Sequence, residues 1–276
     1  MQQPVHKIVI VSSLYLYPTS QGLILTLAHS GTSTGQIHLW ESKANRRSTS
    51  TALKFLVKEF ASVPHCTGVE LLNEPANNGL IQEWYQSTLS ELRAIPGAQD
   101  FPLYIADAWD LPWYSKFVGE RSDFVIVDHH LYRCFTEDEK RLSGEEHAQN
   151  IRTVTSGQLA DMSQKARGNI IVGEWSAGLH IESLRSNDPG EQDRQRRVFV
   201  RAQLDCYEAH TAGWFFWTYK KGEGWDAGWS MKNAMLAEIL PNSFGRKRNP
   251  GLAWNEDTKN EAMRSARGKL CLFMGL

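Results

Sequence analysis

The sequence has little that would mark a secreted or membrane-bound protein. Its 276 residues include only four cysteines, Cys66, Cys134, Cys206 and Cys271, which are scattered and form no CxxC motif. There is no Asn-x-Ser/Thr site for N-glycosylation, and no apolar run approaches the roughly 18 residues of a membrane span. Together these absences predict a reducing, intracellular compartment, the cytoplasm being the simplest choice.

The sequence also lacks an excess of positive or negative charge. The formal net charge is -1, so the chain carries no electrostatic footprint for nucleic acid, and nucleic acid is not expected as a partner. The one short basic segment, residues 245–251, is typical of a solvated turn. The N-terminal residues 6–16 are apolar but β-branched and interrupted by serines, which favours a strand over a secretory signal.

What the sequence does contain is an alternation of apolar runs and amphipathic segments. The apolar runs, nearly continuous as in strands covered on both faces, are residues 22–28, 67–73, 101–107, 123–130, 169–175 and 213–219. Helical patterns between them begin at Ser50, a plausible N-cap, and at Gly79, Ser143 and Gly190. This order predicts a single α/β domain built on a parallel sheet.

Polar and aromatic residues gather where the predicted strands end. Asn73 and Glu74 close one strand, Asp128-His129-His130 another, Glu174 a third and Trp217 the last. In an α/β barrel this edge is the site of catalysis, because the loops after the strands converge there.

Alternation along each strand indicates which side chains share a face. Asp128, His130 and Tyr132 are expected on one face and His129 on the other. By the same rule Glu174 is expected to share its face with 170 and 172, and Trp217 with Phe215. A zinc site made of Asp128, His129 and His130 is disfavoured, because neighbouring strand residues point apart and no further ligand spacing follows.

Two carboxylates on nearby strands suit the cleavage of an acetal. One carboxyl group protonates the departing oxygen, and the other attacks the anomeric carbon to form a glycosyl-enzyme. A nearby tryptophan offers a flat apolar face to a sugar ring. The residues themselves therefore point to Glu74 and Glu174 as a catalytic pair.

Four stretches make the chain resemble a known family. "ELLNEPANN", "VDHHLYRCF", "IVGEWSAGL" and "RAQLDCYEAHTAGWFFWTYKKGEGWDAGWS", in their order, are similar to glycoside hydrolase family five, in its fungal exo-β-1,3-glucanase branch. The earlier stretch "AHSGTSTG" looks most like the intracellular members of that branch. The resemblance covers roughly residues 22 to 240 and implies a (β/α)8 TIM barrel over 1–276. It implies a retaining glycosidase acting on a β-glucan or β-glucoside, without a metal or organic cofactor.

The resemblance also implies a role for individual residues. Glu74 would be the acid/base and Glu174 the nucleophile, with Asn73 hydrogen-bonded to the sugar 2-hydroxyl. Further substrate-binding positions are Tyr132, His130, Trp217 and His29. Tyr132 would orient the nucleophile, and His130 would line the sugar subsite. Trp217 would be the platform under the cleaved glucose. For Trp225 and Trp229 an outer sugar subsite and surface packing stay equally open.

The chain departs from the family pattern at its start. Six strands can be assigned where the family barrel has eight, and no arginine precedes Arg46 to match the family's early-strand arginine. We therefore expect the first one or two βα units to be missing or replaced, with 6–16 as a candidate stand-in strand. Residues 1–21 are expected to form an atypical N-terminus and 241–276 a C-terminal loop and helix.

Three alternatives to this function stay open at the level of sequence. A shortened barrel can be catalytically impaired and serve only to bind glycan. Related branches of the family cleave glucosylceramide or steryl glucosides. Residues 31–35 fit the G-x-S-x-G nucleophile elbow with Ser33, but the helix that this motif requires does not follow convincingly.

Overall fold

The computed structural model describes residues 8–10, 39–63, 66–222 and 224–245. Two predicted features, the strand over 22–28 and the C-terminal helix within 241–276, fall wholly or largely outside these ranges, as do His29, Ser33 and Cys271. Within the described ranges no helix is long and apolar enough to cross a bilayer.

The described residues form two compact units that are interleaved along the chain. Unit 1 comprises the described residues up to Leu131 together with Arg152–Trp175 and Cys206–Phe215. Unit 2 comprises Tyr132–Ile151, Ser176–Asp205 and the described residues from Phe216 onward. The prediction of a single domain stays a prediction.

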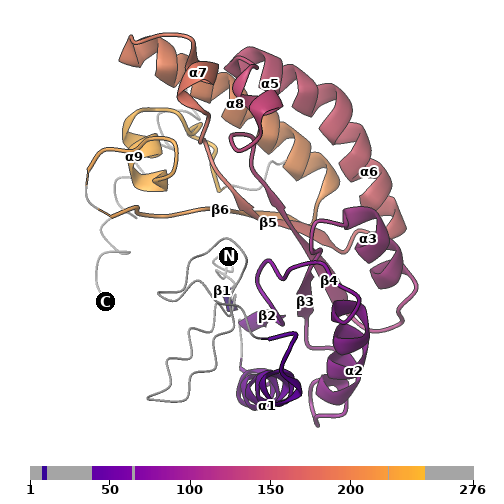
Figure 1. The fold of residues 1–276 in the computed structure, drawn as a ribbon. Coiled ribbons are helices and arrows are strands. Elements are labelled where there is room, and N and C mark those ends of the chain that lie inside the picture. Colours follow the sequence, from indigo (N-terminus) through magenta and orange to yellow (C-terminus); the bar gives the residue numbers. More distant parts are fainter. Residues whose placement is uncertain (1–7, 11–38, 64–65, 223, 246–276) are drawn as a thin grey trace, which may run out of the picture. The chain divides into compact units, whose positions relative to one another are not determined.

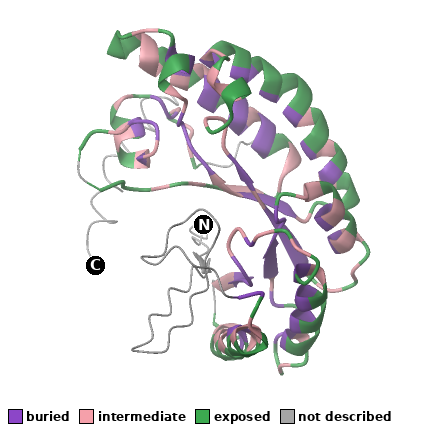
Figure 2. Ribbon diagram, in the orientation of Figure 1, coloured by how far each residue is buried: buried purple, intermediate pink, exposed green. Residues whose placement is uncertain are grey.

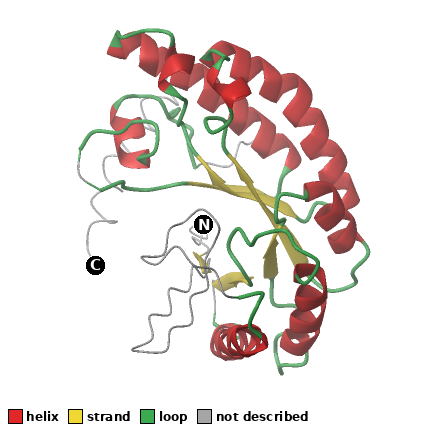
Figure 3. Cartoon of the chain, in the orientation of Figure 1, coloured by secondary structure: helices red, strands yellow, loops and turns green. Residues whose placement is uncertain are grey.

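A parallel sheet forms the centre of unit 1, with strands side by side in chain order (Figures 1 and 3). The order β1-β2-β3-β4-β5-β6 has no reversal, and each pair from β1 to β5 is parallel. The strands are β1 (Ile8–Ile10), β2 (Cys66–Glu70), β3 (Leu103–Ala106), β4 (Val125–Leu131), β5 (Ile170–Trp175) and β6 (Gly213–Phe216). Sequential parallel order is that of a (β/α)8 barrel, since a doubly wound sheet reverses direction at a switch point. The predicted fold class is thereby confirmed.

Helices follow the strands of unit 1, as the βα pattern requires. They are α1 (Lys43–Phe60), α2 (Ile81–Arg93), α3 (Leu111–Gly119), the π-helical turn η1 (Ile151–Thr155) and α6 (Ser156–Lys165). Helix α1 contacts α2 and β2, and α3 contacts β4 and α6. The apolar faces of α1 and α2 and one face of the strands make a common core, buried in Figure 2.

One predicted helix start was wrong. Helix α1 begins at Lys43 and is capped by Ser42, whose side chain accepts a hydrogen bond from the Asn45 amide at 3.2 Å. Ser50 lies inside the helix, where its hydroxyl donates to the Arg46 carbonyl at 3.2 Å. An interior serine can bond back to the turn before it, so it need not mark a helix start.

Unit 2 contains the remaining helices and short loops. Its helices are α4 (Glu137–Lys140), α5 (Gly144–Asn150), α7 (Ile181–Leu184), most of α8 (Pro189–His210) and α9 (Met231–Leu236). Ser143 and Glu146 form a capping box at the start of α5, as expected from the serine at that position.

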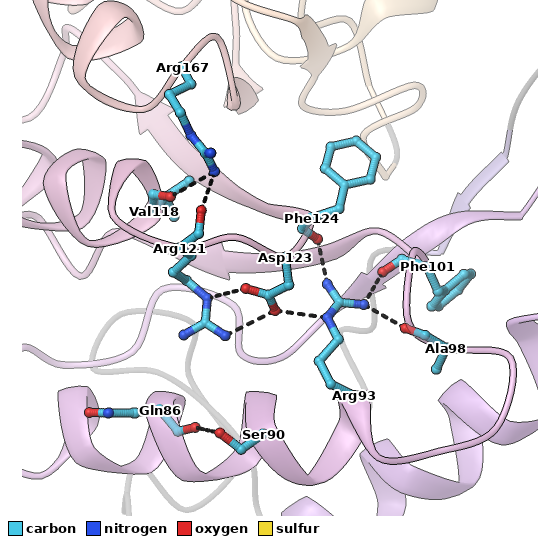
Figure 4. A network of polar contacts seen from close by, with 10 residues as sticks. All are labelled: Gln86, Ser90, Arg93, Ala98, Phe101, Val118, Arg121, Asp123, Phe124 and Arg167. Carbon is cyan, nitrogen blue, oxygen red and sulfur yellow. Dashed lines mark hydrogen bonds and ion pairs between the residues drawn. The ribbon is translucent and has the colours of Figure 1, made fainter.

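An arginine cluster fastens the amino-terminal ends of β3 and β4 (Figure 4). Arg93, at the end of α2, donates to Asp123 at 2.8 Å and to the carbonyl groups of Ala98 and Phe101, and Arg121 donates to the same Asp123. Burial alone would raise the pKa of Asp123, but the hydrogen bonds from Arg121 and Arg93 lower it. Asp123 is therefore ionised and tied to both arginines.

Replacing Arg93 by Ala is expected to lower the free energy of unfolding by about 2–4 kcal/mol, because a largely buried carboxylate and several carbonyl groups lose their donor. Lys116→Ala removes an exposed ion pair with Glu120 and is expected to cost less than about 1 kcal/mol. Urea denaturation of both variants measures the difference. Equal losses of unfolding free energy in the two variants would show that the arginine cluster does not stabilise the fold.

Candidate active site

The predicted acid/base lies in a turn just beyond β2. The strand ends at Glu70, and Glu74 takes a left-handed backbone conformation with φ of 39°. That conformation is uncommon for a residue with a side chain, and such outliers cluster at functional sites. The Glu74 side chain is 17% exposed.

The predicted nucleophile faces the same region because β5 is irregular. Up to Val172 the pairing with β4 is regular, with Asp128 opposite Ile171 and His129 opposite Val172. The register then shifts, so that His130 lies opposite Glu174 rather than Gly173. The expectation that Glu174 shares a face with 170 and 172 was therefore wrong, because strict alternation does not survive such a bulge.

Gly173 is the residue at the irregularity, and it has no room for a side chain. A Cβ atom there would lie 2.0 Å from the nearer carboxylate oxygen of Asp128. A glycine at this point therefore lets the Asp128 carboxylate lie directly against the backbone of β5.

His130 connects the two predicted catalytic glutamates. Its Nδ1 atom lies 2.7 Å from Glu74 Oε1 and 3.5 Å from Glu174 Oε2, while Nε2 lies 3.7 Å from Asp128 Oδ2. One carboxylate oxygen of Glu74, one of Glu174 and a ring nitrogen of His130 all lie within 4.8 Å of one another. Glu74, His130 and Glu174 thus converge on one site in unit 1.

Electrostatics make His130 a cation. Burial opposes its charge, yet the contacts with Asp128 and Glu74 and the charge of Glu174 together raise the pKa of His130 to about 11. The three side chains therefore form a buried ion cluster in which His130 donates to Glu74.

The remaining predicted site residues have different outcomes. Asn73 belongs to unit 1, and its side-chain oxygen is buried with no hydrogen-bond partner among the described residues. Tyr132 and Trp217 belong to unit 2. There Tyr132 packs against Trp229 with ring centroids 5.2 Å apart, and Trp217 is 47% exposed. Their roles toward a sugar stay predictions.

His129 takes no part in the cluster. Its Nδ1 atom lies 2.6 Å from Asp107 Oδ2, so it has a carboxylate of its own. The expectation that His129 and His130 point apart agrees with these separate partners.

Sequence reasoning assigned no role to two buried acids near the cluster. Glu70 is 1% exposed and Asp128 is 2% exposed. Glu70 stands alone within the apolar run "GVELLN", and Asp128 lies two residues before His130. An acid that stands alone within an apolar strand could have marked these two residues as functional candidates. Burying a carboxyl group is costly unless the group is paired, so such an acid needs a reason to be there.

Comparisons with known proteins agree with the motifs. Glucan 1,3-beta-glucosidase 3 of Schizosaccharomyces pombe is 32% identical over 216 residues, which are 77% of this chain and 44% of that protein. The glucan 1,3-beta-glucosidases of Lachancea kluyveri and Blumeria graminis are 26% and 28% identical, over 75% and 76% of this chain. The chain is a homologue of the fungal glucan 1,3-beta-glucosidases. This confirms the resemblance to the exo-β-1,3-glucanase branch of glycoside hydrolase family five.

The matched relatives are longer than this chain. The matches cover 44%, 55% and 57% of those three relatives, so the chain spans about half the length of the curated relatives it matches. No protein-family model matches the chain. Among solved structures, endo-glycoceramidase II from Rhodococcus sp. superposes with a TM-score of 0.49 at 18% identity, covering 73% of this chain and 46% of that one.

Gly173→Ala is expected to lower the free energy of unfolding by about 1–3 kcal/mol, because the new methyl group would overlap the Asp128 carboxylate. Gly157→Ala is the matched control, since nothing lies within 4 Å of its added Cβ in helix α6. That change is expected to be neutral or slightly stabilising. Thermal or urea unfolding that ranks the two variants equally would contradict the close approach.

The charge on His130 makes stability depend on pH. Its pKa in the folded protein, about 11, lies above the ordinary value of 6.5, so the stabilisation is complete below about pH 6.5 and is lost as the pH rises toward 11. We expect the urea midpoint to fall between about pH 7 and 10 in the parent protein, and His130→Asn to flatten that fall. An unchanged slope in the variant would mean that His130 is not the titrating group.

Proposed function

We propose that the protein is a glycoside hydrolase that cleaves β-glucosidic bonds by a two-glutamate double displacement with retention of configuration. The observation that carries this proposal is the approach of Glu74 and Glu174, whose carboxylate oxygens lie within 4.8 Å across the ends of β2 and β5. Retaining enzymes hold their carboxyl groups about 5–5.5 Å apart and inverting enzymes roughly 6.5–9.5 Å. The shorter separation favours retention.

Glu174 is the nucleophile in this proposal. Its carboxylate attacks the anomeric carbon while Glu74 gives a proton to the glycosidic oxygen, so that the aglycone leaves as an alcohol and a glycosyl ester forms on Glu174. Glu74 then takes a proton from water, the water oxygen attacks the anomeric carbon, and the ester bond breaks. The proton that Glu74 gives up in the first step is thus returned in the second.

His130 supports both steps by its position. Its Nδ1 atom lies 2.7 Å from Glu74 and 3.5 Å from Glu174, so a single proton lies between the imidazole and the acid/base. The acid step requires that proton on the Glu74 oxygen. The adjacent Asn73 offers a buried side-chain oxygen to a sugar hydroxyl.

The substrate class follows from the relatives, which are named glucan 1,3-beta-glucosidases. We propose a β-1,3-glucan or a β-glucoside as substrate, and nothing in the site favours glucosylceramide or a steryl glucoside instead. The platform role of Trp217 and the orienting role of Tyr132 are part of the same proposal. An intracellular location stays a prediction.

Turnover of an aryl β-glucoside by the purified chain tests the proposal. Glu74→Gln is expected to reduce kcat/KM by about 10²–10⁴-fold because the general acid is lost, and Glu174→Gln to reduce turnover to background. Azide should restore turnover in Glu174→Ala by replacing the missing nucleophile, and NMR of the first product should show the β-anomer. Glu83→Gln, an exposed glutamate of α2, is the control and should match the parent.

Folded protein without turnover would overturn the proposal and favour a catalytically silent homologue. Turnover that survives both glutamine substitutions would overturn the assignment of the pair.

A further inference from the structure

Two buried acids lie beneath the catalytic pair and are used by neither step of the proposed reaction. Glu70 is the last residue of β2 and Asp128 lies within β4, and both are almost wholly buried. Burying carboxyl groups costs free energy that an apolar side chain of similar size would not. Their positions therefore call for a physical explanation.

Glu70 and Asp128 influence one another. Both are acids, and two like charges in one buried place repel each other. Burial is the largest influence raising the pKa of Glu70, and the charge of Asp128 raises it further. Glu70 therefore keeps its proton to a higher pH than an ordinary carboxyl group does.

Asp128 contacts two parts of the active site, the His130 ring and the backbone at Gly173. Its Oδ2 atom lies 3.7 Å from His130 Nε2, the ring nitrogen that faces away from the catalytic glutamates. The same carboxylate fills the space beside Gly173, where a Cβ would approach it to 2.0 Å. Gly173 directly precedes Glu174, so one carboxylate lies against the histidine and against the backbone that presents the nucleophile.

The charges around this group form a consistent set. His130 carries the positive charge, and Asp128, Glu74 and Glu174 surround it. A further charge on Glu70 would add repulsion in a buried place, so a neutral Glu70 is the arrangement of lowest cost. The other titratable groups that face Glu70 or Asp128 are Tyr104 on β3, which donates to the Thr67 carbonyl, and Tyr85 on α2, which donates to the Ala106 carbonyl.

We propose that Asp128 is a positioning residue that holds the His130 imidazolium by an ion pair and the backbone before Glu174 by close packing. This inference rests on the proposed function, because the groups positioned are the proposed catalytic ones. The contacts of Asp128 can be tested whether or not the protein turns over a substrate. Only the expected effect on rate requires turnover.

The first test follows His130 itself by NMR titration of the labelled imidazole in the full chain. Asp128→Asn removes the charge beside Nε2 and is expected to lower the pKa of His130 by about one to three pH units. Asp107→Asn is the matched control, since Asp107 is an equally buried acid that pairs with His129 at 2.6 Å. It should leave the His130 titration unchanged. Equal titrations in the parent and in Asp128→Asn would overturn the proposal.

The second test follows the rate. In Asp128→Asn the alkaline limb of the kcat/KM profile should move to lower pH, with a loss of about 10²-fold from a displaced pair, whereas Asp107→Asn keeps the parent profile. A purely structural role would reduce the folded fraction and leave the pH profile of the folded molecules unmoved, which would overturn the proposal.

Two outcomes separate this inference from the proposed function. If the parent shows no turnover while Asp128→Asn still lowers the pKa of His130, the proposed function fails and the positioning contacts stand. If Asp128→Asn does not fold, Gly173→Ala displaces the same carboxylate and should give the same fall in the His130 titration. An unmoved titration in that variant would overturn the proposal.

Discussion

The site depends on one break in strand regularity. Glu174 lies opposite His130 only because β5 shifts its register at Gly173, and that shift leaves room for the Asp128 carboxylate against the backbone. A regular strand would turn Glu174 toward the face of 170 and 172, where Ile170 belongs to the apolar core. Only a glycine fits at position 173, and this glycine allows Glu174 and Asp128 to lie next to His130.

Buried charge of this kind is costly, and unit 1 offsets the cost by pairing. His130 is nearly inaccessible, yet its charge is matched by Asp128, Glu74 and Glu174 at 2.7–3.7 Å. Paired and hydrogen-bonded ions are tolerated in the interior, whereas an isolated ion is not. The same pairing keeps the two glutamates close despite their like charge, because a cation lies beside both.

Stability and chemistry occupy opposite ends of the same sheet. Arg93, Arg121 and Asp123 fasten the amino-terminal ends of β3 and β4, with contacts that no substrate would need. The acid–histidine cluster lies at the carboxyl ends of β2, β4 and β5. This division is the one that parallel α/β barrels favour, since the loops that build a site converge only at the carboxyl ends.

The sequence by itself determined the parallel α/β order, five of the strands to within a few residues, and the candidates Glu74, Glu174 and His130, because apolar runs and carboxyl-end motifs are local signals. It misplaced the start of α1, since serine caps and interior serines look alike in one dimension. Only the tertiary structure decided that Glu174 faces His130 and that Glu70 and Asp128 lie beneath them. A register shift and the burial of two acids depend on neighbouring strands, and no periodicity within one strand encodes them.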